Sequence, residues 1–166
     1  LRMSFKTLFG FDEALAEHAT VTYREYDSKQ GLYEFTIYDG IPEALQQLYE
    51  AGLKLSLVTS KAEIYALKIS EKAGFSNLLQ TVSGCEINGQ RSEKAELITW
   101  TLNKLGLEPS LQILMVGDRS FDISGARLAG ISSAAVLYGY GSYEELTAES
   151  PGMLLTSPQD LISILE

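Results

Sequence analysis

Two patterns of hydrophobic and polar positions divide the chain near Tyr38. Before that point the apolar residues follow helical spacing, which predicts a short helix ended by Gly10 and a second helix with Asp12 as its N-cap. No strand pattern occurs before residue 32. We therefore expect residues 1–37 to form a helical segment and residues 38–166 to form a separate domain.

After Tyr38, short apolar runs alternate with amphipathic stretches. The runs predict strands at residues 53–59, 79–83, 111–116, 132–137 and, more weakly, 153–155. Helices are expected at residues 42–51, 62–73, 94–105 and 120–129, and from residues 142 and 158. This alternation is typical of an α/β fold with a parallel sheet. Residues 111–116 are nearly all apolar, which indicates a central strand covered on both faces.

Composition narrows the function classes. The formal net charge of -9 argues against binding to nucleic acid or to an anionic membrane surface, and no apolar run is long enough to span a bilayer. A small anionic substrate remains compatible with this negative charge if a metal ion or a lysine makes the electrostatic field at the site locally positive. Cys85 is the only cysteine, so no internal disulfide can form, which fits a cytoplasmic protein. His18 is the only histidine, and we expect it on a helix surface rather than in a catalytic triad.

Polar residues that could carry chemistry follow three successive predicted strands, where parallel sheets place their functional sites. The most informative segment runs from Gly117 to Asp122. Its spacing brings the carboxylates of Asp118 and Asp122 near one side of a helix start, and carboxylate oxygens are the ligands that Mg²⁺ prefers. In the purely structural interpretation, Asp118 is a helix N-cap and Asp122 a favourable acid near the helix dipole. The segment alone does not distinguish the metal-binding interpretation from the structural one.

The other two positions are less specific by themselves. Thr59 and Ser60 follow the first strand and could hold a phosphate together with backbone N–H groups, but a hydroxyl there is often only a cap. Lys94 begins a helix after the second strand, and most lysines in that position are solvated surface charges. The ordered set of hydroxyl, lysine and paired aspartates is far more specific than any one member.

In that order, the residues resemble motifs two, three and four of phosphatases of the haloacid dehalogenase (HAD) superfamily. Residues 57–61, Lys94 and residues 117–122 carry the resemblance, which covers essentially the whole chain. It implies a HAD-type Rossmann-like parallel sheet flanked by helices. Residues 38–42, Tyr-Asp-Gly-Ile-Pro, resemble the return from a helical cap to the core, so residues 1–37 would be the C-terminal part of the cap.

Two further segments resemble the phosphoglycolate phosphatase group, and most closely its 5′-nucleotidase-like members: Arg-Ser-Glu-Lys-Ala-Glu-Leu-Ile at residues 91–98 and Leu-Tyr-Gly-Tyr-Gly-Ser at residues 137–142. Many phosphoglycolate phosphatases have Lys-Pro at motif three, whereas Ala95 follows the lysine here. The resemblance implies hydrolysis of a small phosphorylated metabolite, such as a nucleoside 5′-monophosphate or phosphoglycolate. Tyr140 could approach the site, although packing of its ring is the interpretation that we favour.

The resemblance also assigns roles. Thr59 would hold a phosphoryl oxygen, with Ser60 adding to that cradle, and Lys94 would offset charge on the phosphoryl group. Asp118 would ligate Mg²⁺ directly. Asp122 would do so through water or by orienting its neighbours. The nucleophile should be the first aspartate of an Asp-x-Asp motif, which would form an aspartyl-phosphate.

No Asp-x-Asp motif occurs in the sequence. We therefore expect the first core strand, which would lie between the strands ending near Thr59 and Val116, to be missing. Loss of a covalent nucleophile typically costs roughly a million-fold in rate, so the chain alone is predicted to be inactive. Unpaired buried backbone groups cost on the order of 1–3 kcal/mol each, so the chain is also predicted not to fold stably alone. Direct pairing of the Thr59 and Val116 strands would contradict this hypothesis.

Three alternatives compete with the phosphatase. A catalytically inactive truncated homologue could bind phosphate or a partner without turnover. A Rossmann-type dinucleotide binder would need a glycine-rich turn after its first strand, and Thr59-Ser60-Lys61 is not one. A true haloacid dehalogenase needs no Mg²⁺, which would leave the pair of Asp118 and Asp122 without a purpose.

Overall fold

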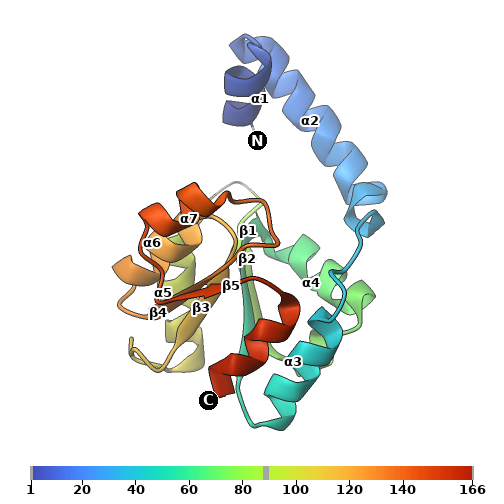
Figure 1. The fold of residues 1–166 in the computed structure, drawn as a ribbon. Helices are drawn as coiled ribbons and strands as arrows, with labels where there is room; N and C mark the ends of the chain where they lie inside the picture. Colours follow the sequence, from blue (N-terminus) through green and yellow to red (C-terminus); the bar gives the residue numbers. More distant parts are fainter. Residues whose placement is uncertain (1, 88–89, 166) are drawn as a thin grey trace. The chain divides into compact units, whose positions relative to one another are not determined.

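The computed structural model describes residues 2–87 and 90–165, and the chain divides into two compact units, Leu1–Thr36 and Ile37–Glu166. The first unit contains α1 (Arg2–Phe9), α2 (Glu13–Lys29) and the short 3₁₀ helix η1 (Gly31–Tyr33), drawn in blue in Figure 1. The two predicted helices are confirmed. Gly10 follows α1 with φ +67°, and the Asp12 carboxylate accepts a hydrogen bond of 2.8 Å from the Leu15 amide.

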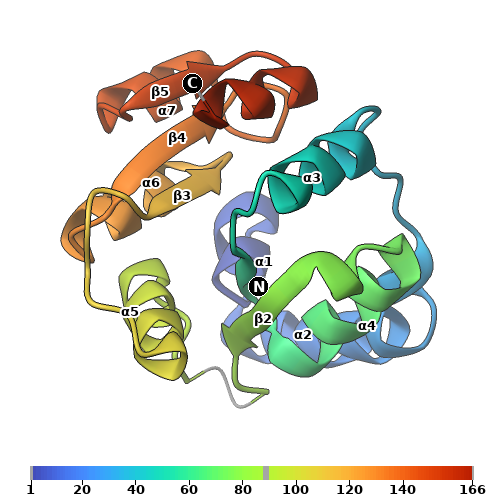
Figure 2. The same cartoon turned by 90° about the horizontal axis from the view of Figure 1, so that it is seen from below.

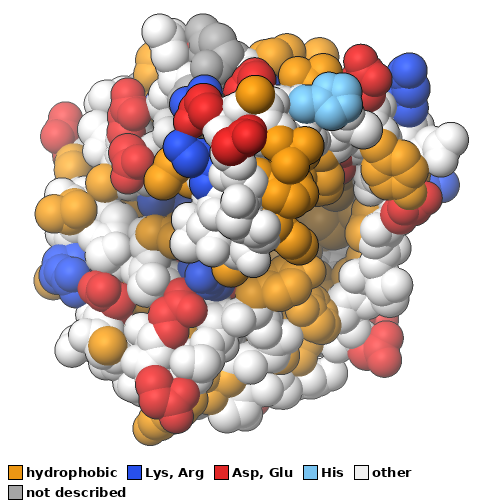
Figure 3. Space-filling view, turned by 90° about the horizontal axis from the view of Figure 1, so that it is seen from above, with side chains coloured by type: hydrophobic (Ala, Val, Ile, Leu, Met, Phe, Trp, Pro, Cys, Tyr) orange, Lys and Arg blue, Asp and Glu red, His pale blue; other side chains and the backbone are white. Residues whose placement is uncertain are grey.

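Aromatic and aliphatic side chains of this first unit remain at its surface. The rings of Phe5, Phe9 and Phe11 lie 5.8 to 6.0 Å apart. Phe9 is 65% exposed, and His18 is exposed as predicted. Hydrophobic side chains accordingly reach the surface between charged ones in the space-filling view (Figure 3).

The second unit has the predicted alternation of strands and helices. Its strands are β1 (Leu55–Ala62), β2 (Leu79–Cys85), β3 (Leu114–Gly117), β4 (Ser132–Val136) and β5 (Met153–Leu155). Its α-helices are α3 (Ile41–Glu50), α4 (Glu63–Ala73), α5 (Lys94–Leu105), α6 (Ser120–Leu128) and α7 (Tyr143–Ala148). Two 3₁₀ helices complete it, η2 (Ser76–Leu78) and η3 (Pro158–Leu165), so the helix predicted from Pro158 forms with 3₁₀ geometry.

The strands form two parallel sheets, which confirms the predicted fold class. One sheet has the order β1-β2 and the other β3-β4-β5. Leu57 pairs with Val82 in the first, and Val116 pairs with Ala134 in the second. Within the described ranges β1 and β3 are not paired, so the finding that would contradict a missing central strand is not seen. The missing strand itself stays a prediction.

Two hydrophobic clusters span both sheets and define the layers (Figures 1 and 2). On one face, α3 and η3 pack on all three strands of the second sheet and on Leu55 of β1. On the other face, α5 and α6 pack on Val58 of β1 and Met115 of β3. Residues of β3 alternate between these clusters, as expected for a strand covered on both faces, yet all four are only half-buried. Its edge toward β1 has no strand partner in the described part of the chain, which accounts for this exposure.

Among the helices described, none is long and apolar enough to cross a membrane.

Candidate active site

The candidate residues lie where parallel strands end and helices begin. Thr59 and Ser60 are in the last part of β1, and Lys94 is the first residue of α5. Asp118 directly follows β3, and Asp122 lies in the first turn of α6. Parallel strands place their functional residues at their carboxyl ends, and β1 and β3 belong to different sheets. Contacts of Lys94 bring the end of β1 together with the start of α6, which follows β3.

Lys94 is the centre of the cluster. It is 8% exposed, so it is not a solvated surface charge. Its Nζ donates a hydrogen bond of 3.1 Å to the Val58 carbonyl and forms an ion pair of 2.9 Å with Asp122 Oδ1. Helix α6 can approach it closely because residue 125 is glycine, where an added Cβ would lie 2.8 Å from Lys94 Cγ. The lysine therefore joins the end of β1 to the start of α6.

Asp122 holds the turn between β3 and α6 together. Its Oδ2 accepts hydrogen bonds from the amides of Asp118, at 3.1 Å, and Arg119, at 3.0 Å. A Cβ at residue 117 would lie 2.3 Å from Asp122 Cβ, so only glycine leaves room for this carboxylate. Of the two roles expected for Asp122, the structure contains the contacts that orient its neighbours.

Asp118 is not the N-cap of α6, since Arg119 occupies that position. The Tyr140 amide donates a hydrogen bond of 2.8 Å to Asp118 Oδ2, and the Gly141 amide donates one of 2.9 Å to the Asp118 carbonyl. Within residues 2–87 and 90–165, Asp118 Oδ1 accepts no hydrogen bond. One carboxylate oxygen is thus fixed and the other is open at the end of the sheet.

The two hydroxyl residues differ in their arrangement. Thr59 Oγ1 accepts a hydrogen bond of 3.1 Å from the Lys61 amide, and within the described ranges its own hydrogen donates to no acceptor. The exposed Ser60 hydroxyl donates to the Ser92 carbonyl at 3.3 Å, while the Cys85 thiol donates to the Ser60 carbonyl. Thr59 directly follows Val58, whose carbonyl accepts the hydrogen bond from Lys94.

The donor set fits a magnesium ion. No group of three or more His, Cys, Asp or Glu residues that could hold a metal occurs in the part of the chain that is described. Mg²⁺ does not need such a group, because it commonly binds through one or two carboxylates, water and substrate phosphate. Asp118 Oδ1 offers one such ligand, and the Asp122 carboxylate stands beside it, already engaged with Lys94.

Sequence reasoning named Tyr140 but not the way it contacts the cluster, and it missed Glu145. Tyr140 is 88% exposed, so the prediction of a packed ring was wrong, and its contribution comes from its backbone amide. Glu145 Oε1 accepts hydrogen bonds of 2.9 Å from Ser120 N and Arg119 Nε. These contacts, first the Ser120 amide and then the Arg119 guanidinium, lower the pKa of Glu145 below its ordinary value. The glycine-flanked tyrosine was the visible signal, but nothing in the sequence indicated contact with Asp118.

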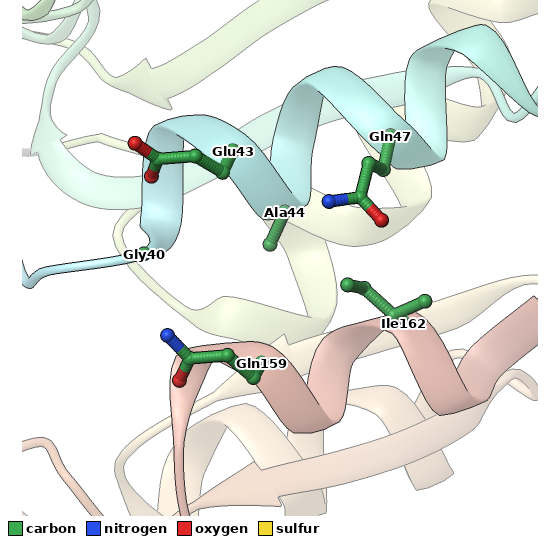
Figure 4. Close-up of a pocket in the computed structure, with 6 residues that line it drawn as sticks. All are labelled: Gly40, Glu43, Ala44, Gln47, Gln159 and Ile162. Atoms are coloured by element: carbon green, nitrogen blue, oxygen red, sulfur yellow. The ribbon is translucent and has the colours of Figure 1, made fainter.

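Two pockets lie outside this cluster. The one in Figure 4, about 300 Å³, opens between α3 and η3 and is lined by Gly40, Glu43, Ala44, Gln47, Gln159 and Ile162. The other, about 510 Å³, lies at the carboxyl end of β2 and is lined by Glu63, Ile64, Cys85, Glu86, Ile87 and Arg91. Neither lining includes the candidate residues, although Cys85 connects the second pocket to Ser60.

Known proteins resemble this chain in sequence and in structure. The family model for haloacid dehalogenase-like hydrolases matches residues 1–136. A 5′-nucleotidase from Pseudomonas aeruginosa is 38% identical over 166 residues, which cover all of this chain and 75% of that protein. Tyrosine-protein kinase PtkA from Mycobacterium tuberculosis is 36% identical over 126 residues, 76% of this chain and 43% of that protein.

A phosphoglycolate phosphatase from Pseudomonas syringae pv. tomato is 29% identical, over 92% of this chain and 56% of that protein. The chain thus spans three quarters of one of these relatives and about half of the other two. The crystal structure of a predicted phosphatase from Clostridium acetobutylicum superposes with a TM-score of 0.91 at 32% identity, covering 99% of this chain and 76% of that one.

Proposed function

Since the chain belongs to the haloacid dehalogenase-like hydrolase family, we propose that its cluster serves a Mg²⁺-dependent phosphomonoesterase. The observation that carries the proposal is that the three motifs contact one another. Lys94 binds both the Val58 carbonyl and Asp122, and Asp122 accepts a hydrogen bond from the Asp118 amide. These contacts bring a positive charge, a threonine hydroxyl and an open carboxylate oxygen to one edge of the sheets. Phosphoryl transfer depends on positioning and on electrostatic stabilisation of this kind.

Each residue has a distinct role in this proposal. Thr59 donates its free hydroxyl hydrogen to a phosphoryl oxygen. The Lys94 ammonium places positive charge beside the phosphoryl group, and Asp122 keeps that ammonium in place. Asp118 Oδ1 would hold Mg²⁺, which when bound neutralises developing negative charge on the phosphoryl oxygens. Ser60 has a smaller role, since its hydroxyl donates to the Ser92 carbonyl.

We further propose that the nucleophilic aspartate lies outside Leu1–Glu166, on a strand that pairs with the free edges of β1 and β3. The absence of an Asp-x-Asp sequence and the lack of pairing between those strands in the described ranges support this. An aspartate carboxylate arriving there would attack phosphorus and displace the alcohol, and water would then release phosphate. Without that strand, the chain would be the inactive homologue considered as the alternative.

For the substrate, we propose a small phosphorylated metabolite, with a nucleoside 5′-monophosphate favoured over phosphoglycolate. The 5′-nucleotidase relative is 38% identical, against 29% for the phosphoglycolate phosphatase. Ala95 at the position after the motif-three lysine adds to this preference.

The test is phosphate release by the full-length protein from AMP, phosphoglycolate and a phosphotyrosine peptide, with Mg²⁺ or with EDTA. We expect release from AMP that requires Mg²⁺. Residues 1–166 expressed alone should release none, and activity in that shorter chain would overturn the proposed origin of the nucleophile. Mg²⁺-independent release, or none from any ester by the full-length protein, would contradict the phosphomonoesterase proposal.

A further inference from the structure

The seven-residue stretch Gly139–Glu145, which runs into α7, contacts the turn between β3 and α6 repeatedly. The amides of Tyr140 and Gly141 donate to the Oδ2 and the carbonyl of Asp118, at 2.8 and 2.9 Å. The Glu145 carboxylate then holds the next two residues of the turn, through Arg119 Nε and the Ser120 amide, both at 2.9 Å.

Both glycines in the stretch are required by close approach. A Cβ at residue 139 would lie 2.3 Å from Asp118 Cβ and 2.5 Å from Asp118 Oδ2. A Cβ at residue 141 would lie 2.2 Å from the Asp118 carbonyl oxygen. Neither Gly139 nor Gly141 has a positive φ, so the backbone conformation itself does not demand glycine. The loop therefore lies directly against Asp118 because two side chains are absent.

The stretch is also anchored at its far end. The Ser142 hydroxyl caps α7 by accepting a hydrogen bond of 3.1 Å from the Glu145 amide. Leu146, on the same helix, is fully buried against Ile123 of α6 and Ala135 of β4. Glu145 lies on, and the loop leads into, a helix that is packed against the core. This packing lets both hold the turn between β3 and α6 in one position.

We propose that Gly139–Gly141 and Glu145 form a positioning clamp. The Tyr140 amide holds Oδ2 of Asp118, the Gly141 amide and Glu145 hold the turn around it, and together they present Oδ1 to a divalent cation. The inference rests on the proposed function, since it assigns a metal-binding role to Asp118. Partners that hold one oxygen of a metal-ligating carboxylate fix its orientation, and their loss typically costs about 10–100-fold in metal affinity or activity. The side chain of Tyr140 takes no part in the clamp, because the donor is its amide.

Binding of Mg²⁺ to the full-length protein, measured by calorimetry without substrate, tests the clamp. Gly139→Ala should weaken binding by about 10–100-fold. Glu144→Gln, the control, changes an exposed side chain in the first turn of α7 that is not part of the clamp, and should bind as the wild type does. In turnover, Gly139→Ala should need a higher Mg²⁺ concentration for half-maximal rate, with kcat largely recovered at saturating Mg²⁺. A defect in folding alone would not recover in this way.

The possible outcomes distinguish failure of the clamp proposal from failure of the phosphomonoesterase proposal. Wild-type affinity in a Gly139→Ala protein with a native circular dichroism spectrum overturns the clamp and leaves the phosphomonoesterase standing. A wild-type protein that neither binds Mg²⁺ nor requires it for turnover overturns both. If Gly139→Ala does not fold, the Glu145→Gln variant decides the question. The Glu145 side chain is part-exposed and glutamine has nearly the same shape, so we expect this variant to fold. Its affinity for Mg²⁺ should fall about 10-fold. Unchanged affinity in that variant would also overturn the clamp.

Discussion

Replacing Lys94 by methionine should destabilise the second unit strongly, because it leaves the Asp122 carboxylate buried without its ammonium partner. The two side chains are only 7% and 5% exposed, and their charged atoms lie 2.9 Å apart. Removing one member of a buried ion pair typically costs about 3–5 kcal/mol. Asp122 keeps two amide donors at 3.0 and 3.1 Å, so we expect the lower end, about 3 kcal/mol.

Urea denaturation of the full-length protein, followed by circular dichroism, measures this change, and thermal melting should show a loss of about 6–12 °C. Arg127→Met is the control, since Arg127 pairs with Glu149 at the surface and its loss should cost about 1 kcal/mol or less. The double variant Lys94→Met/Asp122→Asn should be more stable than Lys94→Met, because no buried charge is left unpaired. A loss below about 1 kcal/mol for Lys94→Met would show that the Asp122 carboxylate does not depend on its ammonium partner.

Two further predictions concern the second unit. The Asp160 carboxylate accepts hydrogen bonds from the hydroxyls and amides of Thr156 and Ser157, which lower its pKa from 3.8 to about 2. The stabilisation from these hydrogen bonds is present above pH 3.8 and is lost as the pH falls toward 2. The urea midpoints of wild type and Asp160→Asn should therefore differ at pH 6 and converge near pH 2. A difference between the two midpoints that stays the same at both pH values would contradict this prediction. Gly117→Ala should lower the free energy of unfolding by about 1–3 kcal/mol, because the new methyl group would overlap Asp122. An unchanged urea midpoint would show that the turn can accommodate the methyl group.

The elements of the second unit could be predicted because local signals agreed with the hydrophobic period. Helix α5 spans Lys94–Leu105 as predicted, and Gly106 ends it with φ +66°. Strand bounds were less accurate: β1 runs from Leu55 to Ala62 rather than over residues 53–59, since ladder partners on β2 decide where the strand begins and ends.

Contacts between distant segments could not be predicted in the same way. The sequence marks Lys94 and Asp122 as charged, but their burial and pairing arise only when α5 packs on α6. The ring of Tyr140 was expected to pack because large aromatic side chains usually bury area, yet the residue acts through its amide, which every non-proline residue has. Hydrophobic patterns therefore located the strand ends where the candidate residues lie, and only the three-dimensional packing revealed how these residues hold one another.

If Asp118 supplies the metal ligand of the proposed phosphomonoesterase, phosphate release must depend on its carboxylate. The most direct test is the rate of phosphate release from AMP by the full-length protein and its Asp118→Asn variant across a Mg²⁺ titration. We predict a rate that rises with Mg²⁺ in the wild type and a loss of at least about 100-fold in the variant that excess Mg²⁺ does not restore. A variant that turns over AMP at the wild-type rate, with the same dependence on Mg²⁺, would contradict the account.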